Sequence, residues 1–177
     1  MVTQGYILQR WINACGGRGH FPIKFNGSIF TVAWPNRLET PSPGLDADFR
    51  MWGGGYWFQN TRLSYWSMLY SGDYDLMRPL FSMFLNSLPL ARERPRIYCN
   101  HAVAFHPETQ CFWGTYHDSN YGRDREGRDN GWTLNTYIRY YWSGGLELAM
   151  MLLDYHAHTQ DEAFVRQVLL PLESEKF

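Results

Sequence analysis

Apolar residues recur at helical spacing in several separate parts of the chain. Between Ile7 and Cys15 they recur at steps of three and four residues, and Gly16-Gly17 then supplies a stop signal, which predicts a first helix. A second helix is predicted from about Trp57 to Tyr70, ending at Gly72. Both predicted helices are followed by glycine, the residue that most readily ends a helix.

The next segment predicts the second half of an α-hairpin. Asp73 is placed to cap it, and a broad apolar stripe runs from Leu76 to Leu88. Pro79 is expected to restart or kink the helix at its beginning. Because only a short turn separates this segment from the preceding helix, the two are expected to pack antiparallel.

Two further helices are predicted near the C-terminal end. The segment from about Gly144 to His158 is apolar on nearly all sides, which indicates burial on several faces and an inner helix. Asp161 is expected to cap a fifth helix, from Glu162 to about Leu170, which ends before Pro171.

Two long stretches, Arg18 to Gly55 and about Glu93 to Trp132, lack helical spacing. Within the first, Lys24 to Val32 predicts a small β-hairpin around Asn26-Gly27. Long irregular segments are uncommon in compact domains and are often functional. We therefore expect these loops to carry the functional site.

The helical segments predict an all-α fold built from stacked α-hairpins. Ser71-Gly72-Asp73 and Thr159-Gln160-Asp161 occupy the same place in two helix–turn–helix units. We expect residues 1–177 to form a single domain that is part of an (α/α)6 toroid, with the small β-hairpin in a long loop. Twelve helices with their connections would need about 250 residues, so five helices indicate a piece of such a barrel.

Composition and charge narrow the function classes. The formal net charge is −1, with 16 Lys and Arg against 17 Asp and Glu, so nucleic acid and anionic membranes are not expected as partners. The sequence has no C-x-x-C pair, and neither a metal nor a cofactor is expected.

No apolar window is long enough for a membrane span, and the first residues do not have the pattern of a signal peptide. The 8 Trp, 12 Tyr and 11 Phe, many of them in Gly- and Pro-rich stretches, suggest a binding surface.

The loops contain carboxylates suited to glycosidic bond cleavage, which requires one protonated carboxyl and a second group that activates water or attacks the sugar. The candidates are Asp46, Asp48, Glu108 and Asp118. Glu108 is the preferred acid, since the apolar residues around it would raise its pKa by desolvation; otherwise it caps a turn or pairs with an arginine. Asp48, close to Arg50, is the candidate base or hydroxyl acceptor, and a structural ion pair is the alternative.

Amide, aromatic and imidazole side chains would complete a sugar site. Amides offer donors and acceptors together, and indole faces cover the C–H face of a pyranose. The expected substrate-binding residues are Arg50, Trp52, Trp57, Gln59, Asn60, His101, His106, Trp113 and Trp142. The alternative roles are helix capping for the amides and core packing for about half of the tryptophans. Glu147, at the start of an apolar helix, faces either the site or a loop backbone.

Three stretches, in the same order, resemble the six-hairpin (α/α) glycosidases, above all the α-L-fucosidase family and a related bacterial branch. Arg18 to Phe30 looks like the segment Pro-x-x-Leu-Gln-Gly-x-Trp of that family. Asn60 to Trp66 is similar to Asn-Thr-x-x-Asn-Tyr-Trp. Trp142 to Gly145, with Tyr155 and Thr159 to Asp161, is similar to Trp-Pro-x-Gly-Gly followed by Tyr-x-x-Thr-Gly-Asp.

The resemblance implies a glycoside hydrolase that acts on an oligosaccharide or polysaccharide. It also implies that the general acid and another acidic residue lie beyond Phe177, that the barrel has further N- and C-terminal parts, and that a β-sandwich domain lies upstream. The isolated chain would then hydrolyse little. A periplasmic or secreted full-length protein is implied as well. The family's second water-holding Asn corresponds here to Phe58.

Two other functions fit the same predicted fold. A polysaccharide lyase would need converging arginines for a uronate, and the sequence offers Arg50 and Arg62. A non-catalytic remnant would keep only carbohydrate binding.

Overall fold

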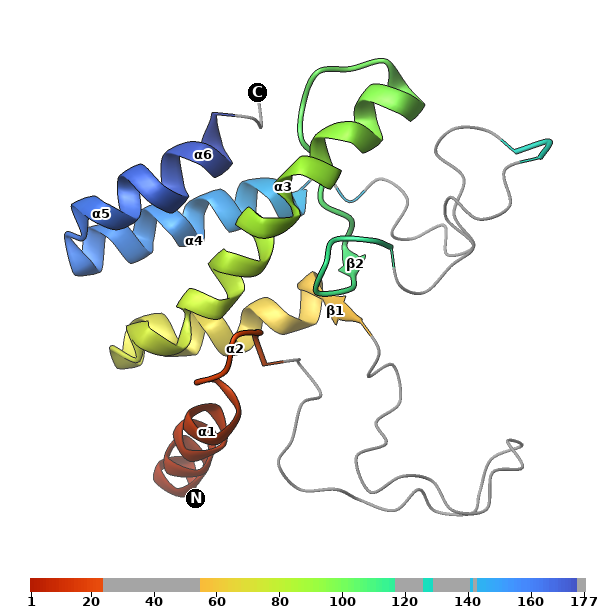
Figure 1. The fold of residues 1–177 in the computed structure, drawn as a ribbon. Coiled ribbons are helices and arrows are strands. Elements are labelled where there is room, and N and C mark those ends of the chain that lie inside the picture. Colours follow the sequence, from red (N-terminus) through yellow and green to blue (C-terminus); the bar gives the residue numbers. More distant parts are fainter. Residues whose placement is uncertain (24–54, 117–125, 129–140, 142, 175–177) are drawn as a thin grey trace, which may run out of the picture.

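A computed structural model of the chain describes residues 1–23, 55–116, 126–128, 141 and 143–174, and these residues are mostly helical (Figure 1). The first half contains α1 (Val2–Gly16), β1 (Tyr56–Trp57), α2 (Phe58–Ser71), the 3-10 turn η1 (Tyr74–Leu76), α3 (Arg78–Cys99) and β2 (Thr109–Gln110). The second half contains α4 (Ser143–Thr159), α5 (Glu162–Phe164), the π turn η3 (Val165–Leu169) and α6 (Leu170–Glu173). The predicted β-hairpin around Asn26 lies outside the described residues.

The helical prediction is confirmed in type and order. Gly72 closes α2 in the left-handed conformation, with φ of 77°, which a glycine adopts without steric cost. The Asp161 carboxylate accepts a hydrogen bond from the Phe164 N–H at 3.0 Å, so this residue caps α5 as predicted.

The predicted cap at Asp73 is wrong, because its carboxylate is occupied elsewhere. Its two oxygens accept hydrogen bonds from Nε and Nη2 of Arg10 at 2.9 and 2.6 Å, and Ser71 Oγ donates a third at 2.6 Å. Arg10 lies on α1, so Asp73 attaches the N-terminal helix to the turn between α2 and α3.

Two helices extend further than predicted: α3 runs through residues 93–99, which were expected to begin an irregular stretch, and the last helical segment runs past Pro171. α3 continues through Pro89 and Pro95 to Cys99. Since Pro95 has no N–H, the Ala91 carbonyl loses its helical donor, and the N–H of Phe105 donates to it instead at 2.9 Å. Pro171 falls in the first turn of α6, after the π turn, where a missing N–H is tolerated.

The helices form two stacked α-hairpins, α2–α3 and α4 with α5–α6. Figure 1 shows α2 and α4 running the same way, with α3 and α5–α6 returning beside each other. Arg62 on α2 reaches Glu147 near the start of α4. At the other end of these hairpins, Arg78 on α3 pairs with Asp161 at 2.8 Å. The parallel placement of equivalent helices matches the repeat predicted from the two similar turns.

The core lies between the two layers that these helices form. It is filled by the inward side chains of both hairpins, and the largest fully buried ones include Tyr65, Met68, Phe81, Met151, Leu152 and Tyr155. The α4 helix buries only one of its faces, and Leu146, Met150 and Leu153 are exposed on the other, contrary to the predicted burial on several sides. No helix among the described residues is both long and apolar enough to cross a membrane.

Candidate functional site

The short β1–β2 ribbon brings Glu108 to the beginning of α2. The ribbon is antiparallel, with Tyr56 opposite Gln110 and Trp57 opposite Thr109. The Glu108 carbonyl accepts the N–H of Phe58 at 2.8 Å, and its carboxylate Oε1 accepts the N–H of Gln59 at 3.1 Å. The first four N–H groups of a helix have no acceptor within the helix. Glu108, which follows α3 in the sequence, accepts two of these N–H groups at the start of α2.

The Glu108 carboxyl is buried, with 2% of the residue exposed. Thr109 Oγ1 donates to its second oxygen at 2.5 Å. Burial raises the pKa of Glu108, while the Thr109 hydroxyl, the Gln59 N–H and the charge of Arg62 act in the opposite direction more weakly. The net direction is upward, as predicted from the sequence.

A second carboxylate lies close by, on α4. Glu147 Oε1 accepts hydrogen bonds from Nε of Arg62 at 2.5 Å and from the indole Nε1 of Trp66 at 3.0 Å. The carboxylate of Glu147 contacts two side chains of α2 rather than a loop backbone, which was one of its two expected roles, and it lies at the end of the hairpins where Glu108 is found.

Tyr141, two residues before the start of α4, lies near both carboxylates. Burial raises the pKa of its hydroxyl, and Arg62 lowers it, whereas the charges of Glu147 and Glu108 raise it further. These effects on the pKa of Tyr141 show that both carboxylates and the guanidinium lie close to its phenol. We call Arg62, Glu108, Tyr141 and Glu147 the α2 entry cluster.

The predicted amides lie at the same end. Gln59 and Asn60 are exposed in the first turn of α2, and Trp57 is half-buried at the preceding position. The Gln59 backbone, rather than its side chain, contacts Glu108. Glu108, Gln59 and Asn60 therefore lie at one end of the hairpin pair.

The two predicted histidines are placed differently from each other. His106 is half-buried against α3, where its ring meets Phe84 edge-on at 5.0 Å and its Nδ1 lies 3.4 Å from Ser87 Oγ. His101 is exposed beyond the end of α3, and its backbone N–H donates to the Pro95 carbonyl. The N–H of His101 donates to the Pro95 carbonyl and the N–H of Phe105 donates to the Ala91 carbonyl, so the chain turns back along α3 between the two histidines. His101 is therefore held at the C-terminal end of this helix.

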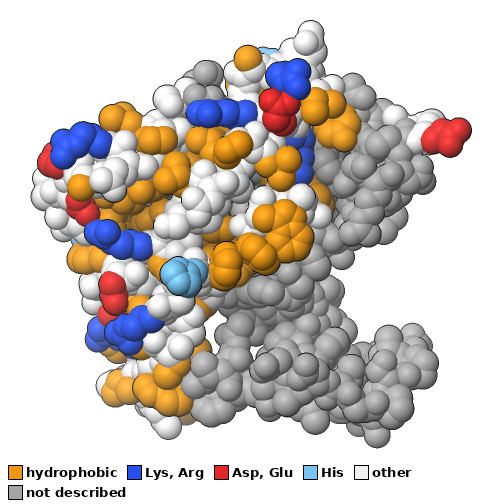
Figure 2. Space-filling model, in the orientation of Figure 1, with side chains coloured by type: hydrophobic (Ala, Val, Ile, Leu, Met, Phe, Trp, Pro, Cys, Tyr) orange, Lys and Arg blue, Asp and Glu red, His pale blue; other side chains and the backbone are white. Residues whose placement is uncertain are grey.

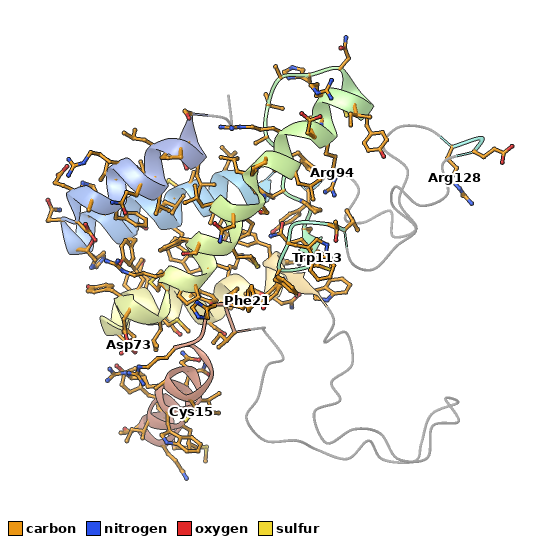
Figure 3. The ribbon with its side chains drawn as sticks, in the orientation of Figure 1. Cys15, Phe21, Asp73, Arg94, Trp113 and Arg128 are labelled. Carbon is orange, nitrogen blue, oxygen red and sulfur yellow. The ribbon has the colours of Figure 1, made fainter. Side chains whose placement is uncertain are left out.

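Trp113 lies in a tight turn after β2, which Figure 3 shows beside the ribbon. It is 53% exposed and its ring meets Phe112 edge-on at 4.5 Å. The remaining candidates, Asp46, Asp48, Arg50, Trp52, Asp118 and Trp142, lie outside the described residues.

Two buried polar side chains beside this cluster have no hydrogen-bond partner among the described residues. The amide of Gln110, 1% exposed, has neither its nitrogen nor its oxygen bonded, and the Thr61 hydroxyl is likewise unpaired. Gln110 and Glu108 are two residues apart in an extended segment, so their side chains leave the same face of the ribbon. Among the described residues, both side chains therefore keep unused hydrogen-bonding groups at this end of the hairpins.

No sequence pattern marks Tyr141 or Gln110, and Arg62 is predicted only as a cation for a lyase. A half-buried tyrosine before an apolar helix has no distinctive local signal. Residues four apart on a helix are neighbours on one face, so the sequence could have predicted that Arg62 and Trp66 lie side by side. Within the described residues, no group of three or more His, Cys, Asp and Glu side chains is arranged to hold a metal ion.

Comparison with known proteins yields no relative: no protein-family model, curated protein or solved structure matches this chain.

Proposed function

We propose that this chain is part of the catalytic (α/α)6 toroid of a glycoside hydrolase, whose glycan site lies at the end where α2 begins. Stacked hairpins with parallel equivalent helices support the toroid, because this is the arrangement that such a barrel repeats. Exposed amides at the start of α2 and an exposed tryptophan after β2 at the same end support a sugar site.

The observation that carries the proposal is the buried carboxyl of Glu108 with its raised pKa. A general acid in glycoside cleavage must hold a proton near the working pH and deliver it to the leaving oxygen. The Thr109 hydroxyl accommodates both states of the carboxyl, since a hydroxyl can donate to the carboxylate and accept from the protonated acid. The proposed base, Asp48, would act from the long loop that precedes β1.

The pairing of Arg62 favours hydrolysis over lyase chemistry. A lyase needs a cationic group to neutralise the uronate carboxylate of its substrate. Nε of Arg62 is already engaged by Glu147 at 2.5 Å, so its charge is compensated within the protein. A neutral glycan therefore fits the α2 entry cluster better than an acidic one.

The test compares Glu108→Gln with wild type in a polypeptide long enough to complete the proposed toroid, using aryl glycosides with poor and good leaving groups. Loss of a general acid is worth about 10²–10⁴-fold, and we expect that loss for the poor leaving group and a much smaller loss for the good one, which needs little protonation. Glu93→Gln, an exposed glutamate paired with Arg96, is the matched control.

Equal losses for the two leaving groups would contradict the role of Glu108 as the acid. Release of an unsaturated uronate from polygalacturonate would instead establish the lyase. The 177-residue chain alone is expected to release little aglycone, and rapid turnover by it, abolished by Glu108→Gln, would show that no further part of the barrel is needed.

A further inference from the structure

Three exposed aromatic rings from two distant segments form a continuous patch. Phe21, after α1, lies 4.5 Å from Phe112 between ring centroids, and Phe112 lies 4.5 Å from Trp113. Their exposed fractions are 50%, 44% and 53%. Figure 2 shows hydrophobic side chains gathered near the middle of one face, at the place where Figure 3 labels Phe21 and Trp113.

The turn that carries two of these rings is rigidly built. The Gly114 N–H donates to the Cys111 carbonyl at 2.8 Å, and the Cys111 N–H donates to the Thr115 carbonyl at 2.8 Å. Gly114 has φ of +95°, and a Cβ there would lie 2.6 Å from Cβ of Ser87 on α3. The turn is therefore held against α3 by a contact that only glycine permits.

The residues at the corner of this turn are unusual. Corner positions normally hold Gly, Pro, Asn, Asp or Ser, which favour the turn and tolerate solvent. Here Phe112 and Trp113 occupy the corner and stay exposed, although neither is needed to form the turn. Their hydrophobic surface is thus available to a ligand, and the pinned backbone removes most of the ordering cost of binding.

We propose that Phe21, Phe112 and Trp113 form a preformed stacking platform for a neutral pyranose unit of the glycan. The inference rests on the proposed function and names a subsite of it. Phe112 is inclined by 53° to Phe21 and by 88° to Trp113, so a sugar ring would stack its C–H face on one flat ring while the other rings contact its edge. None of the three side chains carries a charge. Phe112 is four residues from Glu108, at most about 14 Å along an extended chain, so the two residues lie within the length of one oligosaccharide.

The test is isothermal titration of the 177-residue chain with cellohexaose, xylohexaose and mannohexaose. Trp113→Ala is expected to weaken binding of the preferred hexaose about tenfold, and Trp113→Phe to retain most of the affinity. Tyr70→Ala, which removes an exposed aromatic ring at the opposite end of α2, is the matched control and should bind like wild type. Circular dichroism checks that each variant is folded.

Binding of no hexaose, or equal affinities for Trp113→Ala and Tyr70→Ala, would overturn the platform. A dimer in light scattering that dissociates in Trp113→Ala, with hexaose affinity unchanged, would assign the patch to self-association and would also overturn it. The two proposals fail separately. Lost affinity without any hydrolysis supports the platform alone, whereas an acid-type loss in Glu108→Gln with normal binding by Trp113→Ala supports the hydrolase alone.

Discussion

Replacing Glu108 by alanine should destabilise the fold much more than replacing it by glutamine. Alanine removes the acceptor for the Gln59 N–H, and loss of a helix cap costs about 0.5–2 kcal/mol. It also leaves the fully buried Thr109 hydroxyl without its acceptor, which costs about 1–3 kcal/mol. The free energy of unfolding should fall by about 2–4 kcal/mol in Glu108→Ala.

Glutamine keeps the shape of the side chain and one carbonyl oxygen, and Thr109 can accept from its amide. Glu108→Gln should therefore change the free energy of unfolding by less than about 1 kcal/mol at neutral pH. Because Glu108→Gln removes the titrating proton but keeps the cap of α2, it is the appropriate variant for the catalytic test.

The pH dependence has a definite sign. The pKa of Glu108 is raised in the folded state, so the unfolded chain releases this proton first as pH rises. Wild-type stability relative to Glu108→Gln should be greatest below the ordinary glutamate pKa and should decline as pH rises through the raised value.

Urea denaturation followed by circular dichroism, at several pH values from 4 to 8, measures both effects. Glu93→Ala, an exposed glutamate in an ion pair with Arg96, is the control and should change stability by no more than about 0.5 kcal/mol. Equal destabilisation by alanine and glutamine at position 108, or a wild-type stability that rises relative to Glu108→Gln with pH, would refute the reasoning.

Other changes test separate parts of the structure. Gly114→Ala should lower the free energy of unfolding by more than about 1 kcal/mol, because the residue has positive φ and its new Cβ would meet α3 at 2.6 Å; an unchanged urea midpoint would contradict this. Thr61→Val should leave stability unchanged or raise it by up to about 1 kcal/mol, since it removes a buried hydroxyl without a partner among the described residues, and a clear loss would show that the hydroxyl is bonded. Asp73→Asn should speed amide exchange in α1. Because the hydrogen bonds from Arg10 hold the pKa of Asp73 below its usual range, the wild-type chain should lose the same protection only as pH falls through that lowered value. Protection factors of α1, corrected for the intrinsic pH dependence of exchange, that stay unchanged in Asp73→Asn and at low pH would be contrary evidence.

The parts of the fold that depend on local pattern could be predicted from the sequence. Apolar spacing located the helices, Gly72 marked a helix end, and Asp161 marked a cap, because each signal acts within a few residues. The extension of α3 past Pro95 could not be predicted in this way. Its compensating donor, the N–H of Phe105, comes from a later loop whose course the local pattern does not specify.

In the candidate site too, local features could be predicted from the sequence and long-range contacts could not. Burial of Glu108 and the upward direction of its pKa followed from its apolar neighbours in sequence. Its hydrogen bond to the start of α2 joins residues 49 apart, and the Arg62–Glu147 contact joins residues 85 apart. Such contacts depend on how the two hairpins stack. The two similar turns indicate that the hairpins stack, but not which residues then meet.

The most direct test of a glycan site at the start of α2 is an NMR titration of the 177-residue chain with the hexaose that binds tightest. The account predicts the largest amide shift changes at Gln59 and Asn60 and at Phe112 and Trp113, with α5–α6 unaffected. Changes confined to α1 or to α5–α6, or no change at saturating hexaose, would contradict it.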